Sequence, residues 1–338
     1  MTFSIVIPTC NGSRFIEAAL LSALNQTRKA DQVLVSDDNS SDDTLEICRK
    51  YGESISIFTN ESGPSGFVNG WLKAIGHADG DFITILHQDD LISPDYLFHV
   101  ENALLQYPDV CHVYSRSEKI SEFFDRLQLK PTPEVKAVLY TGKQYAKNYI
   151  NGIYKSEYIH RCPGVTTSRK LLLESCTYRE EAGHIADDDF FFRIGNYTKV
   201  IGIDTILAYY REHASSTTSR QENLSFILAG NWVFQMEEYH GKKNPLLDEE
   251  DMGRIAISAV RDLTTTLETA LRNKDDMLLA EMLILRGRIF RCIHQSPGQI
   301  TESLNKKALW WLIDRKMKRS AILYSRFIYQ LKRILRDG

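Results

Sequence analysis

The chain has 338 residues, of which 43% are hydrophobic and 25% charged, and its formal net charge is −3. This length can bury a substantial core, and the composition is that of a folded globular protein with no overall charge that would favour nucleic acid. The six cysteines are scattered, without a C-x-x-C pair or zinc-type spacing, which predicts reduced thiols in a cytosolic protein.

The N-terminal residues show no targeting pattern. The apolar run from Ser4 to Pro8 has no basic region before it and is too short for the core of a signal peptide. No stretch approaches the ~20 apolar residues that a membrane-spanning helix needs. We therefore expect a cytoplasmic protein.

Strands alternate with helices over the first 115 residues. Short apolar, β-branched runs indicate buried strands, and apolar residues spaced by three and four indicate helices. Such alternation predicts an α/β fold with a doubly wound, mostly parallel sheet and right-handed crossovers. The predicted strands cover residues 3–7, 32–36, 54–59, 81–86 and 110–115, and the predicted helices cover residues 14–26, 44–51, 66–77 and 95–106.

Two later regions differ from this pattern. Residues 117–138 are polar and contain two prolines, which predicts an ordered insertion or a mobile loop. Beyond about residue 221 the strand patterns stop, and apolar residues recur at three and four, so we expect a helical C-terminal extension.

Three acidic clusters lie along the α/β pattern. The first is Asp37-Asp38-Asn39, the second is Gln88-Asp89-Asp90 and the third is Asp187-Asp188-Asp189. Carboxylates at the carboxyl ends of parallel strands converge on the crevice where an open α/β sheet binds its ligand. Three clusters in one crevice indicate a nucleotide, a divalent metal and a general base, and hence group transfer from an activated donor.

The first cluster follows a buried strand directly. Helix capping explains Ser41 or Asp42, since serine and aspartate are favoured N-cap residues. Capping does not explain two consecutive aspartates at the end of the strand. A carboxylate placed there accepts an N–H of the donor's nucleobase.

The second cluster contains adjacent carboxylates, which repel each other unless they share a cation. Mg²⁺ and Mn²⁺ prefer oxygen ligands, commonly bridge carboxylates to a diphosphate and stabilise charge on a departing diphosphate. The alternative is a turn and helix cap before Pro94. The neighbouring acidic clusters favour the metal site.

The third cluster precedes an aromatic helix. Its carboxylates either complement the positive end of the helix dipole or supply a general base, and on chemistry alone any one of the three serves as the base. Further on, Arg211 and His213 lie two residues apart on an extended segment and so point to the same side. This pair is suited to diphosphate oxygens and to completing the metal site, although a lone histidine is more often an ordinary packed residue.

Together these residues resemble the family 2 inverting glycosyltransferases of the GT-A fold, over roughly residues 3–218. The matching pieces are residues 4–11, residues 37–42, Gly80-Asp81 ahead of the second cluster, Asp187 with residues 190–193, and the Arg211/His213 segment. By this resemblance the nucleotide sugar is bound by Pro8, Thr9, Asn11, Asp38, Asn69, Asp89 and Arg211, Mn²⁺ or Mg²⁺ is held by Asp89, Asp90 and His213, and the catalytic base is Asp187.

The resemblance extends to a subgroup rich in rhamnosyltransferases, through residues 63–65, Asn69 and Gln88. The chain departs from the family at three positions. His87 and Ala186 stand where Asp and Glu are common, and Val68 stands where Arg is often found. We interpret these departures as variation in donor or subgroup, because the three acidic clusters are intact.

The resemblance also suggests a division of the chain. Residues 1–220 form a GT-A domain, with a nucleotide-binding half at 1–100 and an acceptor half at 101–220, and residues 221–338 form the helical region. Residues 306–338 contain ten Lys or Arg and two Asp, a charge of +8 that leaves −11 for the rest of the chain. An apolar stripe in this tail predicts an amphipathic helix.

Two interpretations of the basic tail remain open. It packs on the protein or on a second subunit as an ordinary amphipathic helix, or it lies on an anionic membrane surface. Lipid-linked acceptors, which are common among bacterial enzymes of this type, add weight to the membrane interpretation. Nucleic-acid binding is disfavoured because the acidic remainder of the chain opposes it.

The expected function is a metal-dependent, inverting hexosyltransferase of bacterial surface polysaccharide synthesis, peripheral on the inner face of the cell membrane. It would use a UDP- or dTDP-linked donor and a lipid-linked glycan acceptor. A sugar nucleotidyltransferase is one alternative, but it would need a glycine-rich phosphate loop, and residues 9–14 contain a single glycine. A non-catalytic nucleotide-binding scaffold is the other.

Overall fold

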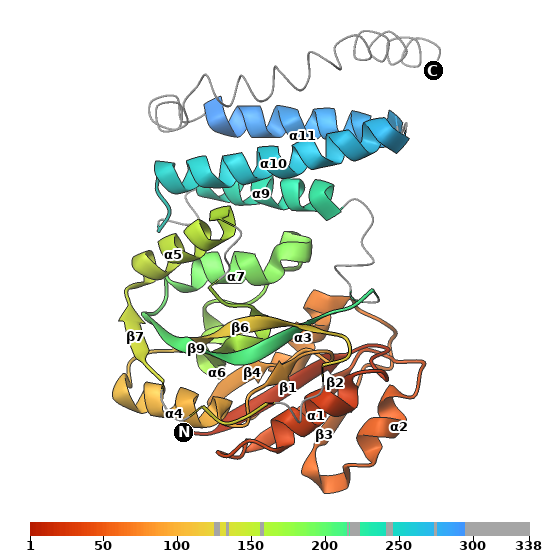
Figure 1. Cartoon of the computed structure of the whole chain (residues 1–338), viewed down its shortest axis with the longest axis vertical. Coiled ribbons are helices and arrows are strands. Elements are labelled where there is room, and N and C mark those ends of the chain that lie inside the picture. Colours follow the sequence, from red (N-terminus) through yellow and green to blue (C-terminus); the bar gives the residue numbers. More distant parts are fainter. Residues whose placement is uncertain are drawn as a thin grey trace.

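The computed structural model describes residues 1–124, 129–132, 135–155, 159–214, 216, 224–240, 246–273 and 276–294. Within these ranges an α/β domain is followed by a stack of long helices (Figure 1). In chain order the elements are β1 (Phe3–Thr9), α1 (Ile16–Leu24), β2 (Gln32–Asp37), α2 (Thr44–Arg49), η1 (Gly52–Ser54), β3 (Ser56–Thr59), α3 (Phe67–Gly76), β4 (Phe82–Ile85), β5 (Leu91–Ile92), α4 (Tyr96–Gln106), β6 (His112–Ser121), β7 (Ala137–Tyr140), α5 (Gly142–Lys155), η3 (Cys162–Gly164), β8 (Val165–Ser168), α6 (Arg169–Glu174), η4 (Glu180–Ile185), α7 (Ala186–Ile194), β9 (Val200–Glu212), α9 (Leu224–His240), α10 (Glu249–Asn273) and α11 (Asp276–His294).

The strands form a nine-stranded sheet in the order β3-β2-β1-β4-β8-β6-β9-β5, with β7 also paired to β9. The first four strands are parallel, as the alternation of strands and helices predicts. Beyond them the sheet is mixed, because β8 runs antiparallel to β4 and β6 while β6 and β9 are parallel. The predicted α/β fold is confirmed, and its run of four parallel strands lies within residues 3–85.

The strand β1 shows why the sequence folds in this way. Phe3, Ile5 and Ile7 are completely buried in the core between the sheet and helices α1 and α4, and Val6 is buried in the core on the opposite face. A strand covered on both faces requires a continuous apolar run instead of alternation. The apolar segment at the start of the chain therefore becomes the centre of the parallel sheet.

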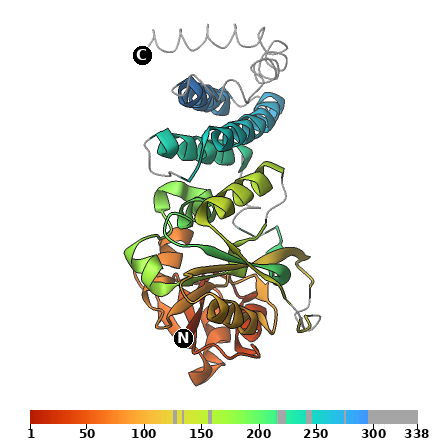
Figure 2. The same ribbon diagram turned by 90° about the vertical axis from the view of Figure 1, so that its left-hand side faces the viewer.

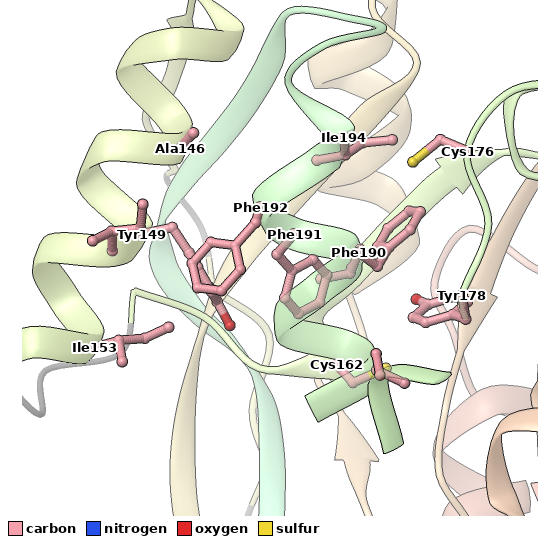
Figure 3. Close-up of a cluster of buried hydrophobic side chains, with 14 of the residues drawn as sticks. Ala146, Tyr149, Ile153, Cys162, Cys176, Tyr178, Phe190, Phe191, Phe192 and Ile194 are labelled. Carbon is pink, nitrogen blue, oxygen red and sulfur yellow. The ribbon is translucent and has the colours of Figure 1, made fainter. Parts of the chain in front are cut away.

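The helical extension shares the core of the α/β domain. Phe190, Phe191 and Phe192 of α7 pack between the sheet and α5, against Tyr149 among others (Figure 3). The ring of Trp232 on α9 lies 6.3 Å from that of Phe192. Figures 1 and 2 show α9, α10 and α11 stacked on the side of α5 and α7 that faces away from the parallel strands. No break in the hydrophobic core accompanies the expected boundary near residue 220, and the boundary stays a prediction.

The insertion or loop expected at residues 117–138 is strand at both of its ends, so its predicted bounds are wrong. Strand β6 continues to Ser121 because Ser117 to Ser121 pair with Ala208 to Glu212 of β9, and Ala137 and Val138 begin β7. These β6 residues are mostly exposed and polar, so their sequence carries no strand pattern. Pairing with a strand about 90 residues later decides their conformation, as tertiary context often does for strands.

Two further expectations concern the chain as a whole. The six cysteines are free thiols, as their scatter predicts. In the described ranges, no helix combines the length and the apolar character needed to cross a membrane. The basic tail at residues 306–338 lies outside the described residues, so its two interpretations stay open.

Candidate functional site

The first acidic cluster lies at the carboxyl end of β2, beside the end of β1, and we call this region the nucleotide edge after the ligand that the sequence predicts there. Asp38 is 7% exposed, and its carboxylate accepts hydrogen bonds from Asn60 Nδ2 at 2.7 Å and from the N and Oγ of Ser65 at 2.6 and 2.9 Å. Burial alone would raise the pKa of Asp38, but these hydrogen bonds outweigh it and lower the pKa below its ordinary value. The carboxylate is therefore held ionised at a fixed position.

The loop before α3 makes this arrangement possible. Gly63 and Gly66 have φ of +96° and +88°, a backbone region that glycine enters without steric cost. The turn directs Ser65 toward Asp38, and the carbonyl of Gly63 accepts a second hydrogen bond from Asn60. The predicted ligand Asn69 lies on the first turns of α3 and donates to the carbonyl of Ser65 at 3.1 Å.

Asp37 is a candidate that the sequence interpretation did not select. It is 1% exposed and pairs in register with Thr9 across the parallel strands. Its Oδ2 accepts the Ser40 N–H at 3.0 Å, whereas its buried Oδ1 has no hydrogen-bond partner among the described residues. A buried carboxylate oxygen without a donor is costly, so Asp37 Oδ1 offers an acceptor for a ligand N–H at the nucleotide edge.

The remaining predicted residues of β1 and its loop lie beside this edge. Thr9 Oγ1 donates to Gln88 Oε1 at 2.5 Å, which ties the end of β1 to the second acidic cluster. Asn11 is exposed at the start of the following turn with φ of +52°, and its side chain accepts the Ser41 N–H at 2.8 Å. Pro8 is buried within β1, next to β2.

The second acidic cluster meets the end of β9. His213 Nε2 lies 2.9 Å from Asp89 Oδ2, and its ring packs 4.6 Å from that of Phe15. Arg211 lies over the same Phe15 ring, 5.0 Å from its centroid. The expected grouping of Asp89, Arg211 and His213 on one side of the extended segment is therefore present in the structure.

The hydrogen bonds of Arg211 show a second role for this residue. Its guanidinium donates to the carbonyls of Asp89, Ser121, Glu122 and Phe124 at 2.8 to 3.2 Å, and the residue is 6% exposed. In this conformation its donors hold the turn after β6 against the second acidic cluster. Arg211 therefore has a structural role at the edge of the site. Its guanidinium contacts a diphosphate only if these hydrogen bonds rearrange.

Asp90 is not brought into the Asp89–His213 pair. It is 4% exposed, and its Oδ1 accepts the backbone N–H of Arg211 at 2.8 Å, while Oδ2 lies 3.4 Å from His87 Nδ1. Burial and the neighbouring charge of Asp89 raise the pKa of Asp90. His87, one of the departures from the family pattern, stacks on Trp71 with ring centroids 5.1 Å apart.

These positions determine which side chains could hold a metal ion. The described part of the chain contains no group of three or more His, Cys, Asp or Glu side chains arranged to hold a metal. Asp89 and His213 supply two adjacent protein ligands, which fits a divalent cation that takes its other ligands from phosphate oxygens and water. The carboxylate suits Mg²⁺ or Mn²⁺ equally.

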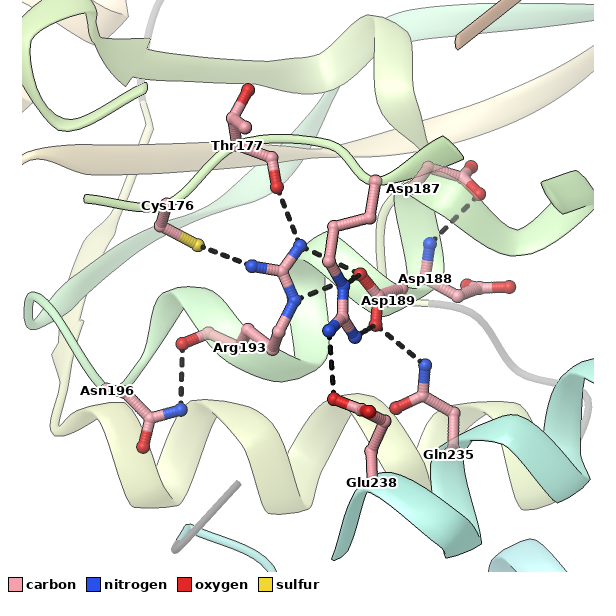
Figure 4. Close-up of polar contacts among 10 residues, drawn as sticks. Cys176, Thr177, Asp187, Asp188, Asp189, Arg193, Asn196, Gln235 and Glu238 are labelled. Carbon is pink, nitrogen blue, oxygen red and sulfur yellow. Dashed lines mark hydrogen bonds and ion pairs between the residues drawn. The ribbon is translucent and has the colours of Figure 1, made fainter. Parts of the chain in front are cut away.

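The third acidic cluster occupies the first turn of α7, where its carboxylates leave the helix in different directions (Figure 4). Asp189 is completely buried and paired with two arginines, and Asp188 is 6% exposed and accepts the Tyr149 hydroxyl at 2.6 Å. Asp187 is partly exposed, and its Oδ1 accepts the N–H of Asp188 at 2.9 Å. Geometry thus favours Asp187 among the three carboxylates that chemistry alone left equivalent.

Helix α3 connects the three clusters. Lys73 lies 3.9 Å from the carboxylate of Asp38, and Trp71 stacks on His87, two residues before Asp89. Phe67 contacts the ring of His184, three residues before Asp187, with centroids 5.5 Å apart. Helix α3 therefore contacts residues within or close to each of the three clusters, while the convergence of their carboxylates on a single crevice stays a prediction.

Residues 4–166 match the family described as Glycosyl transferase family 2. An uncharacterized glycosyltransferase of Rickettsia typhi is 28% identical over 242 residues, covering 70% of this chain and 68% of the relative. A GalNAc(5)-diNAcBac-PP-undecaprenol beta-1,3-glucosyltransferase of Campylobacter jejuni is 39% identical over 93 residues, covering 26% of this chain and 29% of the relative. These matches support a family 2 glycosyltransferase domain in the N-terminal part of the chain.

Solved structures show the same fold. TarS of S. aureus matches with a TM-score of 0.63 and 17% identity over 90% of this chain, which spans 50% of TarS. TarS 1–349 in complex with UDP-GlcNAc matches with a TM-score of 0.57 and 16% identity, covering 88% of this chain and 92% of that one. The expected GT-A-type fold is confirmed.

Proposed function

We propose that this chain, which carries a family 2 glycosyltransferase domain, is an inverting transferase that moves a sugar from a UDP- or dTDP-linked donor to a hydroxyl of a lipid-linked glycan. The observation that carries the proposal is the position of Asp187. Asp187 is the partly exposed carboxylate of the third acidic cluster and lies at the start of α7. Helix α3 contacts the segment just before α7 and also contacts residues at the other two clusters.

The donor is bound at the nucleotide edge. Either Asp38 or the buried Oδ1 of Asp37 accepts the single N–H of a uracil or thymine base, and Thr9 closes the same edge. When bound, a divalent cation at Asp89 and His213 would neutralise charge on the departing diphosphate. The structural similarity to TarS 1–349, which was solved with UDP-GlcNAc, supports a uridine donor for this chain.

Asp187 acts on the acceptor. It takes the proton of the attacking hydroxyl, and the oxygen then forms a bond to the anomeric carbon from the face opposite the diphosphate, whose bond to that carbon breaks. Attack from the opposite face inverts the configuration.

One relative supports the proposed acceptor. The name of the Campylobacter jejuni relative states that it acts on an undecaprenol-linked glycan, which supports a lipid-linked acceptor and a role in surface polysaccharide synthesis. Residues 306–338 would then bring the enzyme to the inner face of the membrane. The similarity of residues 63–65 and Asn69 to rhamnosyltransferases makes dTDP-rhamnose one donor to test.

The direct test is donor hydrolysis against a panel of UDP- and dTDP-linked sugars, with Mn²⁺, with Mg²⁺ and with EDTA. We expect metal-dependent release of one nucleoside diphosphate, and a faster release with the correct acceptor. No release from any donor, together with no nucleotide binding by calorimetry, would contradict the proposal and favour the non-catalytic scaffold. Activity that persists in EDTA would support the transferase reaction but contradict its dependence on a metal.

A further inference from the structure

The carboxylate of Asp189 lies at the centre of a buried charge cluster behind the first turn of α7 (Figure 4). Arg179 donates to it through Nε at 2.9 Å and through Nη2, and Arg193 donates through Nε at 2.9 Å and Nη2 at 2.8 Å. Gln235 Nε2 adds a fifth hydrogen bond at 2.9 Å. One completely buried carboxylate is thus fixed from three directions.

Two arginines on one carboxylate leave an excess positive charge, and Glu238 balances it. Its Oε2 accepts from Arg179 Nη1 at 2.9 Å, and its side chain is 14% exposed. The four groups, Arg179, Arg193, Asp189 and Glu238, then sum to zero. Although burial opposes this, the two guanidinium groups lower the pKa of Asp189, so it stays ionised. Removing one partner of such a buried network leaves an uncompensated charge.

Gln235 and Glu238 lie on α9, outside the part of the chain that matches the family. Glu238 binds Arg179, which immediately precedes η4, the segment that leads into Asp187, and Gln235 binds Asp189, two residues after Asp187. The hydrogen bonds therefore hold the chain at one point ahead of the candidate base and at one point after it. On the other side of the helix, Tyr149 of α5 holds Asp188.

We infer that Gln235 and Glu238 are positioning residues, which hold Asp187 in its reactive orientation by locking Arg179 and Asp189. This inference rests on the proposed role of Asp187 as the base. The helical region is then a working part of the active site. Small errors in the placement of a reacting group reduce turnover while leaving donor binding intact, since the donor is held at the nucleotide edge.

The chain offers a matched pair of variants for the test. Glu238→Gln removes the charge that balances Arg179. Glu237→Gln makes the same change one residue earlier, where the carboxylate pairs with Arg288 of α11 at 2.7 Å on the exposed side of the helix. For both variants kcat, donor KM and the melting temperature are measured on the full chain, with kcat normalised to the fraction of protein that binds nucleotide.

We expect Glu238→Gln to lower normalised kcat about 10- to 100-fold with donor KM within about twofold, and Glu237→Gln to leave both unchanged. Glu238→Asp, which restores the charge, should recover part of the loss. A melting temperature that falls while normalised kcat is unchanged would overturn the inference and leave a purely structural role. The variant Asp187→Asn separates the two proposals. Full activity in this variant would contradict the role of Asp187 as the base. An inactive Asp187→Asn together with a fully active Glu238→Gln would contradict only the positioning role of Glu238.

Discussion

The nucleotide edge and the first turn of α7 hold their carboxylates in different ways. Asp38 is bound by Asn60 and Ser65, which are 22 and 27 residues away in the same β–α segment. Asp189 is bound by Gln235, which is 46 residues away on a helix of the C-terminal extension. The first arrangement is built by neighbouring turns of the parallel sheet, whereas the second combines the local Arg179 and Arg193 with Gln235 of the extension.

This difference predicts a division of labour. Nucleotide binding should depend on the first half of the chain and tolerate changes in the helical region, whereas turnover should be sensitive to both. Four substitutions test this contrast, in order of the effect expected on activity.

The largest loss is expected for Asp187→Asn, which removes the proposed base without changing the size of the side chain. We expect kcat to fall about 10²- to 10⁴-fold, the usual contribution of a positioned base, with nucleotide affinity unchanged. Turnover and calorimetry measure the two quantities separately. Glu181→Gln, an equal loss of charge at an exposed position of η4, is the control and should keep full activity.

Asp38→Asn tests the other side of the contrast. The amide cannot accept the Asn60 and Ser65 donors as the ionised carboxylate does, so we expect nucleotide affinity to fall by about 1–3 kcal/mol with kcat at saturating donor largely retained. Asp43→Asn, at an exposed position near the start of α2, should change neither. A large loss of kcat with unchanged nucleotide affinity would contradict the assignment of nucleotide binding to the first half of the chain.

His213→Asn tests the candidate metal ligand. With Mn²⁺ present we expect nucleoside diphosphate to bind roughly tenfold more weakly, about 1.4 kcal/mol, and with EDTA we expect no difference from the unchanged chain. Calorimetry in the two buffers measures this. His77→Asn, at an exposed histidine stacked on Phe58, is the control. Equal weakening in both buffers would show that His213 supports the fold around Phe15 instead of a cation.

Asp188→Asn should have the smallest effect on turnover and a clear effect on the pH dependence of stability. Burial and the charge of Asp187 raise the pKa of Asp188 to about 7, above the value of ~3.9 for an unperturbed aspartate. The folded state therefore binds more protons between about pH 4 and pH 7, and the free energy of unfolding falls as pH rises through this window. The amide can still accept the Tyr149 hydroxyl but does not titrate.

Urea unfolding at pH 5 and pH 8 measures the consequence. The unchanged chain should lose stability between these values, and Asp188→Asn should lose less. The variant should therefore be the more stable of the two at pH 8. An identical pH dependence in both chains would show that Asp188 does not titrate in this window.

The contrast between the two regions also shows which features could be predicted from the sequence and which could not. The parallel strands, their helices and the acidic clusters at the strand ends were predictable, because hydrophobic period and side-chain chemistry are local properties of the chain. The grouping of Asp89 with His213 was expected from the family resemblance. The strand at residues 117–121 was not predictable, since its polar residues extend only by pairing with β9.

The sequence by itself determined the α/β pattern, the order of the motifs and the chemical types available at the site, since each of these depends on residues that are neighbours along the chain. Tertiary structure decided how each carboxylate of the third cluster is surrounded. It buried Asp189 between two arginines, enclosed Asp188 against Tyr149 and left Asp187 accessible. It also brought Gln235 and Glu238 of α9 to the charge cluster, because burial and charge compensation depend on contacts between residues far apart in the chain.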